Sequence, residues 1–223
     1  MSRDAFAQHL EALPLIAILR GIRPPEAAEI GCALADSGFG LIEVPLNSPD
    51  PLDSIERLAR ALGGRVLVGA GTVLDPADLN RVADAGGRMI VSPHMDLEVI
   101  RAAAARSLVA IPGVATPTEA FAALRSGADA LKLFPAEMLA PAVLRALLAV
   151  LPPAVRLLPV GGISPDNMGP YLAAGAAGFG IGSALYKPGM GARDVGAAAR
   201  RFVTAFRGHK SSGAARPVSP GGG

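Results

Sequence analysis

Two charged residues lie inside short apolar runs of the sequence, and both could do chemistry there. Lys132 is flanked by leucines in ALKLF (130–134), and Glu43 lies within LIEVPL (41–46). Burial of an unpaired ammonium lowers its pKa, and burial raises that of a carboxyl. Two structural alternatives are a lysine that points to water and a buried Glu–Lys ion pair. Groups perturbed in this way more often do acid–base or covalent work, which we take as the leading interpretation.

Glycine turns follow two later apolar runs and point to an anion site. Gly161 and Gly162 lie in VGGIS, and Gly182 precedes Ser183 in GIGSAL. Glycine lets the backbone approach a ligand closely, and backbone N–H groups bind phosphate. Either turn alone is a weak signal. Their position after the last two predicted strands favours a phosphate site.

Further polar residues follow other apolar runs. Arg20 ends the first run, Thr72 ends the third, and Pro93 follows the fourth beside His94. The chain has 3 histidines, and Asp and Glu show no spacing typical of metal ligands. We therefore expect no metal site.

Apolar runs alternate with amphipathic stretches of about 10 to 15 residues, which indicates βα units. Strands are predicted at 15–20, 41–46, 66–71, 88–92, 108–113, 130–134, 156–160 and 178–182. Helices are expected from near Pro24, Pro51, Pro76, Met95, Pro117, Pro141 and Pro165, with a last one over 191–207. A doubly wound sheet is an alternative, but no G-x-G-x-x-G turn follows the first run. The pattern favours an α/β fold, a (β/α)8 TIM barrel, with its active site at the carboxyl ends of the strands.

The composition fits one domain over residues 1–207 and excludes several classes of partner. Hydrophobic residues make up 51% of the 223 residues and charged residues 18%, which argues against disorder. With no Trp, two Tyr and no apolar run of membrane-spanning length, neither nucleic acid nor a membrane is an expected partner. The single cysteine, Cys32, fits a cytoplasmic location. Residues 208–223, rich in Gly, Ser and Pro, are expected to form a flexible, disordered tail.

Six segments together resemble a known family: LIAILRGI, EVPLNSP, GAGTV, LKLFPAE, PVGGISPDN and GIGSALY. They are similar to the 2-keto-3-deoxy-6-phosphogluconate and galactonate aldolases, class I pyruvate aldolases, and the resemblance covers residues 13–207. It implies that Lys132 forms a Schiff base with the C2 ketone of the substrate and that Glu43 is the general acid/base. It also implies that no cofactor or metal is needed and that the protein is a homo-oligomer, commonly a trimer.

The resemblance also assigns binding residues. Arg20 and Thr72 match polar groups around the substrate carboxylate and ketone, and Pro93 lines that end. The residues that match the site of the 6-phosphate are Gly161, Gly162, Gly182 and Ser183.

Residues at two places in the sequence resemble the galactonate branch of the family rather than the gluconate branch. Asn47 and Ser48 stand where the gluconate branch has an Arg-Thr pair, and Val160 stands where that branch has a threonine. Val160 offers no hydroxyl to the C4 hydroxyl of the substrate. The resemblance therefore implies cleavage of 2-dehydro-3-deoxy-6-phospho-D-galactonate to pyruvate and D-glyceraldehyde 3-phosphate. The same chemistry on the gluconate epimer, and a phosphate-binding barrel without lyase chemistry, are the alternatives.

Overall fold

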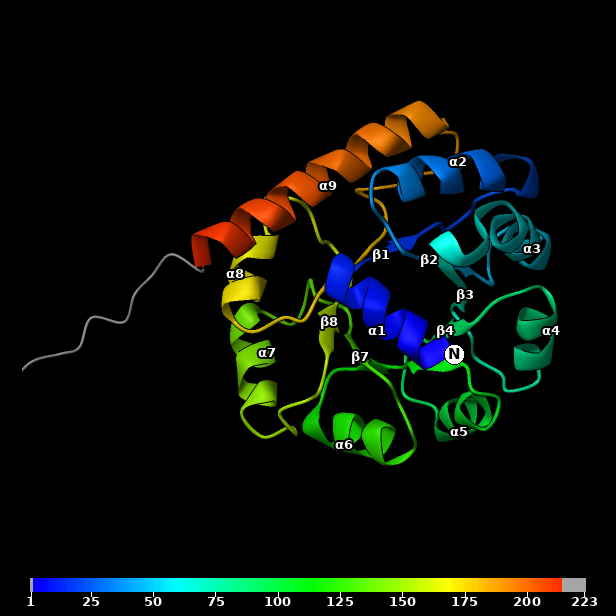
Figure 1. Cartoon of the computed structure of the whole chain (residues 1–223). Helices are drawn as coiled ribbons and strands as arrows, with labels where there is room; N and C mark the ends of the chain where they lie inside the picture. The colour runs from blue at the N-terminus through cyan, green and yellow to red at the C-terminus, as the bar shows by residue number, and fades with distance from the viewer. Residues whose placement is uncertain (1, 214–223) are drawn as a thin grey trace, which may run out of the picture.

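Each predicted apolar run contains a strand. A computed structural model describes residues 2–213 of the chain (Figure 1). The strands are shorter than the apolar runs by a residue or two at their ends, where the backbone turns toward the flanking helices. They are β1 (Leu15–Ile18), β2 (Leu41–Pro45), β3 (Leu67–Gly71), β4 (Met89–Val91), β5 (Val109–Ile111), β6 (Gly113–Val114), β7 (Leu131–Leu133), β8 (Leu157–Pro159) and β9 (Phe179–Ile181).

The predicted helices are confirmed, and a proline opens several of them because its missing N–H is not needed in the first turn. After α1 (Ser2–Ala12) come α2 (Pro24–Asp36), α3 (Pro51–Leu62), α4 (Asp78–Asp84), α5 (Leu97–Ala105), α6 (Pro117–Arg125), α7 (Pro141–Leu148), α8 (Met168–Ala173) and α9 (Ala192–Gly213). A short 3-10 turn, Gly63–Arg65, follows α3. No helix within residues 2–213 is both long and apolar enough to cross a membrane.

Helix α9 passes the predicted end of the domain. It continues from residue 207 to Gly213, so the first residues of the predicted tail are helical. The sequence has no proline between 189 and 216, so the backbone is not forced to leave the helix at 207, and Gly208 is accommodated within it. The remainder of the predicted tail, 214–223, lies outside the described residues.

The hydrogen-bonded strands of the described chain form two parallel sheets. One has the order β5-β4-β3-β2-β1-β9 and the other the order β6-β7-β8. Pro112 separates β5 from β6, and a proline has no N–H to donate to a sheet ladder. The predicted α/β class is confirmed, whereas the single closed sheet of the prediction is divided at two places, at this proline and between β8 and β9, where an isolated bridge pairs Val160 with Gly180. Figure 1 shows helices around the strands.

Strand alternation points Glu43 away from the helices. In β2, Ile42 and Val44 belong to the large core that lies under the helices. Leu41 belongs instead to a second cluster, between the strands, together with Leu158 of β8. Successive side chains on a strand point to opposite faces, so Glu43 shares the inward face of Leu41.

Lys132 faces inward by the same rule. Its neighbours Leu131 and Leu133 pack in the core under the helices, and Ala130, two residues earlier, belongs to the inner cluster. The Lys132 side chain is only 5% exposed. The alternative of a lysine that points to water is therefore wrong.

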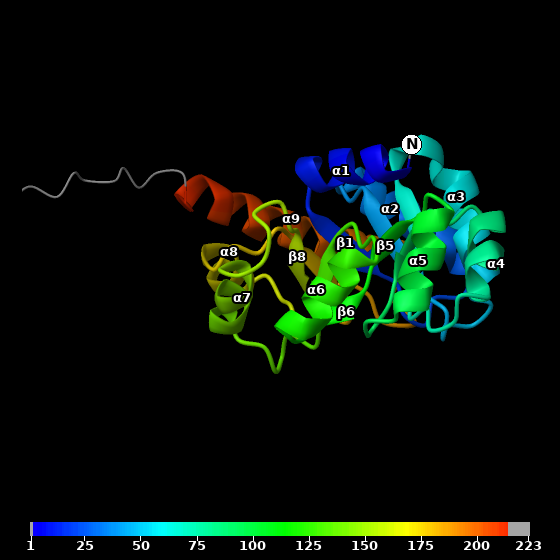
Figure 2. The same cartoon turned by 90° about the horizontal axis from the view of Figure 1, so that it is seen from below.

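An amino-terminal helix, α1 (Ser2–Ala12), was not predicted and covers one end of the strands. Its Phe6 and Leu10 pack on residues at the start of strands, among them Leu41 and Met89. Figure 2 shows α1 on one side of the strands. Because α1 covers the amino ends, the carboxyl ends are left for a site.

Candidate active site

Lys132 lies in the middle of β7 with its amine enclosed. The Nζ atom lies 4.4 Å from the centre of the Phe134 ring. Burial lowers the pKa of the Lys132 amine below its ordinary value, while Glu43 acts to raise it and Arg20 to lower it. A lowered pKa increases the share of neutral amine, and the neutral amine is the form that attacks a carbonyl carbon.

Glu43 is a buried carboxyl with an unsatisfied oxygen. It is 2% exposed, and its Oε2 accepts no hydrogen bond from the described residues. Burial raises the pKa of the Glu43 carboxyl, an effect that Lys132 and Arg20 oppose. The absence of a side chain at Gly71 makes room for it, because a Cβ there would lie 2.8 Å from Cδ of Glu43. A buried ion pair that only stabilised the fold would need its lone pairs satisfied. This carboxyl is better suited to hold and release a proton.

Glu43 and Lys132 share a small inner cavity. Its volume is about 10 Å³, which is about the space that one water molecule requires. The other lining side chains are apolar, and the backbone of Gly180 provides the remaining surface. The lining residues besides Glu43 and Lys132 are Ile16, Ile18, Val91, Ile111, Leu158, Val160 and Gly180. The two titratable groups therefore interact in a largely apolar enclosure, where a charge on either one strongly affects the other.

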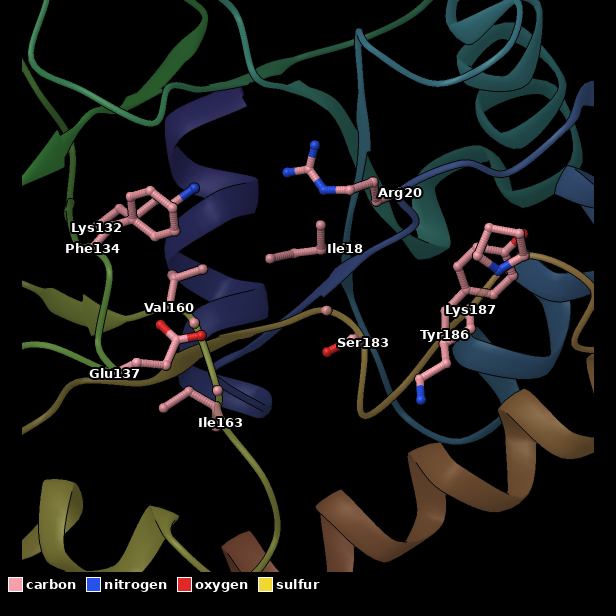
Figure 3. A pocket seen from close by; sticks show the side chains of 14 residues that line it. Ile18, Arg20, Lys132, Phe134, Glu137, Val160, Ile163, Ser183, Tyr186 and Lys187 are labelled. Atoms are coloured by element: carbon pink, nitrogen blue, oxygen red, sulfur yellow. The ribbon is translucent and has the colours of Figure 1, made fainter.

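A larger cavity of about 280 Å³ adjoins the inner one and gathers most of the predicted site (Figure 3). Lys132, Ile18 and Val160 line both cavities, so they lie between the two spaces. The predicted site residues that line the larger cavity are Arg20, Lys132, Val160, Gly161, Gly162, Gly182 and Ser183. Residues from β1, β7, the end of β8 and the end of β9 thus meet in one hollow at the carboxyl ends of the strands.

Arg20, just beyond β1, is held by two neutral side chains. Its guanidinium donates to Oδ1 of Asn47 at 2.7 Å and to the Thr72 hydroxyl at 3.4 Å. Thr72 is outside the larger cavity and is linked by this bond to Arg20, which lines it. Its backbone has a positive φ of 55°, which is uncommon for a threonine and marks a sharp turn after β3. A carboxylate at the mouth of the cavity would meet the guanidinium first.

The turn after β8 presents backbone without side chains to the cavity. Gly161 and Gly162 have φ values of 109° and 61°, a conformation that glycine adopts most easily. The Asn167 side chain donates to the Gly162 carbonyl at 2.8 Å and fixes the turn. Ser183 and Gly182 lie on the cavity wall beside this turn. The turn and its wall suit a small anion or hydroxyl-bearing group.

Pro93, like Thr72, is a predicted site residue that lines neither cavity. Its backbone carbonyl lies against Gly113, where an added Cβ would be 2.3 Å from the Pro93 oxygen. Pro93 therefore packs at the point where the sheets divide.

Sequence reasoning missed several lining residues. Glu137, Tyr186 and Lys187 line the larger cavity, and Figure 3 shows their side chains around it. Each of them follows a strand by several residues, and no apolar run marks its position. Glu137 lies against the glycine turn, since a Cβ on Gly161 would meet its Oε2. The tail of the segment LKLFPAE was the one available signal for Glu137.

Comparison with known proteins places these residues in a family context. Residues 6–199 match the family model described as KDPG and KHG aldolase. A protein of Rhizobium meliloti (strain 1021) called "Probable 2-dehydro-3-deoxy-6-phosphogalactonate aldolase" is 52% identical over 182 residues, which are 82% of this chain and 86% of that protein. The "2-dehydro-3-deoxy-6-phosphogalactonate aldolase" of Escherichia coli (strain K12) is 46% identical over 87% of this chain and 95% of its own length.

Solved structures agree with the sequence matches. A structure described as "Native KDPGal structure" superposes with a TM-score of 0.88 at 45% identity. The match covers 89% of this chain and 97% of the other.

Proposed function

This chain belongs to the KDPG and KHG aldolase family, and from that premise we propose that it cleaves 2-dehydro-3-deoxy-6-phospho-D-galactonate to pyruvate and D-glyceraldehyde 3-phosphate. The proposed reaction is that of a class I aldolase, a carbon–carbon lyase that works through a Schiff base. The names of the 52% and 46% identical relatives support the galactonate substrate.

One observation carries the proposal: Lys132 is a buried amine at the junction of two cavities, opposite a buried carboxyl. It is 5% exposed and shares the inner cavity with Glu43. Burial lowers the pKa of Lys132 and raises the pKa of Glu43, so each group is shifted toward its neutral form. A neutral amine and a protonated carboxyl are the pair that imine formation requires.

The first half of the reaction joins Lys132 to the substrate. The neutral Nζ attacks the C2 ketone, and the carbonyl oxygen becomes the hydroxyl of a carbinolamine. Glu43 donates a proton to this hydroxyl, which leaves as water, and an iminium remains between Nζ and C2. The inner cavity has room for about one water molecule beside both groups.

The second half breaks the bond between C3 and C4. The Glu43 carboxylate takes the proton of the C4 hydroxyl, directly or through a water, and the electrons of the C3–C4 bond move into the iminium to form an enamine. D-Glyceraldehyde 3-phosphate leaves as an aldehyde. Protonation of C3 and hydrolysis of the imine then release pyruvate and restore the Lys132 amine.

We assign the two ends of the substrate to two groups of residues around the larger cavity. We assign the carboxylate to Arg20 and to Thr72, which is hydrogen-bonded to it, and the resemblance adds Pro93 to the lining of that end. The phosphate is assigned to the backbone of Gly161, Gly162 and Gly182 and to the Ser183 hydroxyl. Lys187, on the same wall, adds a positive charge near this end.

Borohydride reduction in the presence of pyruvate tests the proposal directly, because it converts a Schiff base into a stable secondary amine. An adduct on Lys132 is the expected result. Absence of this adduct would favour the alternative function, a phosphate-binding barrel without lyase chemistry.

Three broader proposals accompany the reaction. The two sheets are proposed to form one closed (β/α)8 TIM barrel, since only Pro112 separates β5 from β6 and a parallel bridge pairs Val160, directly after β8, with Gly180 of β9. The protein is proposed to work in the cytoplasm, as its single cysteine suggests. It is also proposed to form a homotrimer, for which the exposed side chains of Leu74 and Met138 are candidate contacts.

Activity is expected to survive metal removal. The protonated imine at Lys132 withdraws electrons from C3, which is the task that a metal ion performs in other aldolases. Dialysis of the enzyme against EDTA should leave kcat within about twofold of the untreated value. A loss of activity that zinc or magnesium restores would contradict the Schiff-base mechanism in its metal-independent form.

Val160 is expected to influence the choice between epimers. Its side chain lies between the two cavities and is 7% exposed. It has no group that can form a hydrogen bond. We expect Val160→Thr to shift the ratio of kcat/KM for the two epimers toward gluconate by about twofold to tenfold, the value of one net hydrogen bond. Valine and threonine are nearly equal in shape, so packing changes little.

The matched control for this ratio is Val150→Thr, because Val150 is 56% exposed and lines neither cavity. It should leave the epimer ratio unchanged. A wild-type enzyme that prefers the gluconate epimer would overturn the branch assignment, and an unchanged ratio in Val160→Thr would remove Val160 from specificity.

A further inference from the structure

The loop that follows β2 holds the loop that follows β1 at two points. Oδ1 of Asn47 accepts a hydrogen bond from the Arg20 guanidinium at 2.7 Å. The hydroxyl of the next residue, Ser48, accepts one from the backbone N–H of Gly21 at 2.9 Å. Consecutive residues of one loop therefore bind the side chain and the backbone of consecutive residues of the other.

These two hydrogen bonds matter because the Arg20 side chain needs support from outside its own loop. Its side chain is long and exposed, and its flexible stem gives it many rotamers. The Asn47 bond is much shorter than the 3.4 Å contact with Thr72. Asn47 is therefore the stronger of the two supports, and a fixed guanidinium loses less freedom when a carboxylate binds.

The charge of the supporting residue matters as much as its position. Both acceptors on the guanidinium, an amide oxygen and a hydroxyl, are neutral. They orient Arg20 without cancelling its positive charge, which stays available to an anion in the cavity. A carboxylate in the place of Asn47 would hold the guanidinium equally well and would compete with the anion.

We propose that Asn47 is a positioning residue that fixes the Arg20 guanidinium for the substrate carboxylate while leaving its charge uncompensated. The inference rests on the proposed function. Asn47 thereby sets the affinity for the carboxylate end that the sugar acid and pyruvate share. It does not take part in bond making, so its effect falls on KM rather than on kcat.

Removal of the amide tests the positioning. Asn47→Ala should raise the KM for the sugar acid about tenfold, with kcat within about twofold of wild type. The pyruvate concentration for half-maximal borohydride trapping should rise by the same factor. The matched control is Asn80→Ala, because Asn80 accepts from Arg106 at the same 2.7 Å and lines neither cavity. It should leave both values unchanged.

Asn47→Asp separates positioning from simple loop support. The aspartate keeps the hydrogen bond to Arg20 but neutralises its charge. We expect KM to rise at least as much as in Asn47→Ala, with the melting temperature retained. If Asn47 only braced the loop, the aspartate would restore the wild-type KM, and that result would overturn the proposal.

A double-mutant cycle shows whether the effect passes through Arg20. In an Arg20→Ala background, Asn47→Ala should change KM no further, because the group that it positions is gone. A persisting tenfold effect there would also overturn the proposal. Failure of the proposed function is distinguishable, since the wild-type enzyme would then form no pyruvate adduct at all.

Discussion

Lys132→Ala is expected to lower kcat/KM by a factor on the order of 10⁴ or more, as removal of a catalytic nucleophile does in other enzymes. The reason is chemical: without a primary amine at this position no imine forms, and the C3–C4 bond has no electron sink. The measurement is steady-state cleavage of the sugar acid, together with borohydride trapping in the presence of pyruvate.

The sequence makes the trapping experiment unusually easy to interpret. The chain has three lysines: Lys132, Lys187 and Lys210. Peptide mapping of the reduced adduct therefore distinguishes few positions. Lys132→Ala should abolish the adduct, and Lys187→Ala, which removes the other cavity lysine, should retain it. An adduct on Lys187 in the wild-type enzyme would sink the proposed mechanism.

Lys132→Met guards against the trivial explanation that the variant fails to fold. Methionine fills a similar volume without an amine to bury, and burial of a lone amine opposes folding. We expect its melting temperature to equal or exceed that of wild type, while activity is lost as in Lys132→Ala. Inactivity accompanied by unfolding in both variants would show that Lys132 supports the fold rather than the reaction.

The strands could be predicted from the sequence because this fold buries them on both faces. Such strands appear as continuous apolar runs, in which a single charge such as Lys132 or Glu43 stands out. The burial and opposed pKa shifts of these two groups followed from that pattern. Both lie in the middle of their strands, and only the expectation that the site opens at the carboxyl ends followed from the βα order.

Other features could not be predicted, for reasons that are physical. Glu137 and Lys187 reach the cavity from loops, where the chain path depends on tertiary contacts rather than on local pattern. Asn47 was noticed only as a branch marker, since its bond to Arg20 joins residues 27 positions apart. Helix α1 was missed because its apolar face consists mainly of Phe6 and Leu10. The break at Pro112, by contrast, has a cause that is visible in the sequence, the proline itself.

The free space in the site and the pKa values of its titratable groups depend on the same features of the structure. Gly71 and Gly180 have no side chains where Glu43 and Val160 pack against them, since a Cβ at either would come within 2.8 Å of the partner side chain. The space so created is apolar, and this is what pushes the two titratable groups toward their neutral forms. Arg20 adds a positive charge at the open side, which further lowers the pKa of Lys132. The same arginine thus serves the proposed nucleophile and the proposed carboxylate site.

Glu43→Gln is expected to lower kcat by about 10² to 10⁴, the usual contribution of a general acid or base. Glutamine has the same shape but cannot carry a proton between the carbinolamine and the C4 hydroxyl. Loss of the carboxylate also removes an interaction that raises the pKa of Lys132, so the pKa of the amine should fall further in the variant. Pyruvate trapping should therefore be slower but should still reach Lys132.

The pH dependence and a remote variant complete this test. Burial raises the pKa of Glu43, so a plot of wild-type kcat against pH should have a limb, a region in which kcat changes with pH, above the ordinary range of carboxyl pKa values. The plot for Glu43→Gln should lack this limb. Glu11→Gln is the matched control, since Glu11 is exposed on α1 at the opposite end of the strands, and its profile should equal that of wild type. If Glu43→Gln kept kcat within about tenfold of wild type, with the limb intact, the proton transfer would have to be assigned to another group. The Glu137 carboxylate on the cavity wall would then be the next candidate to test.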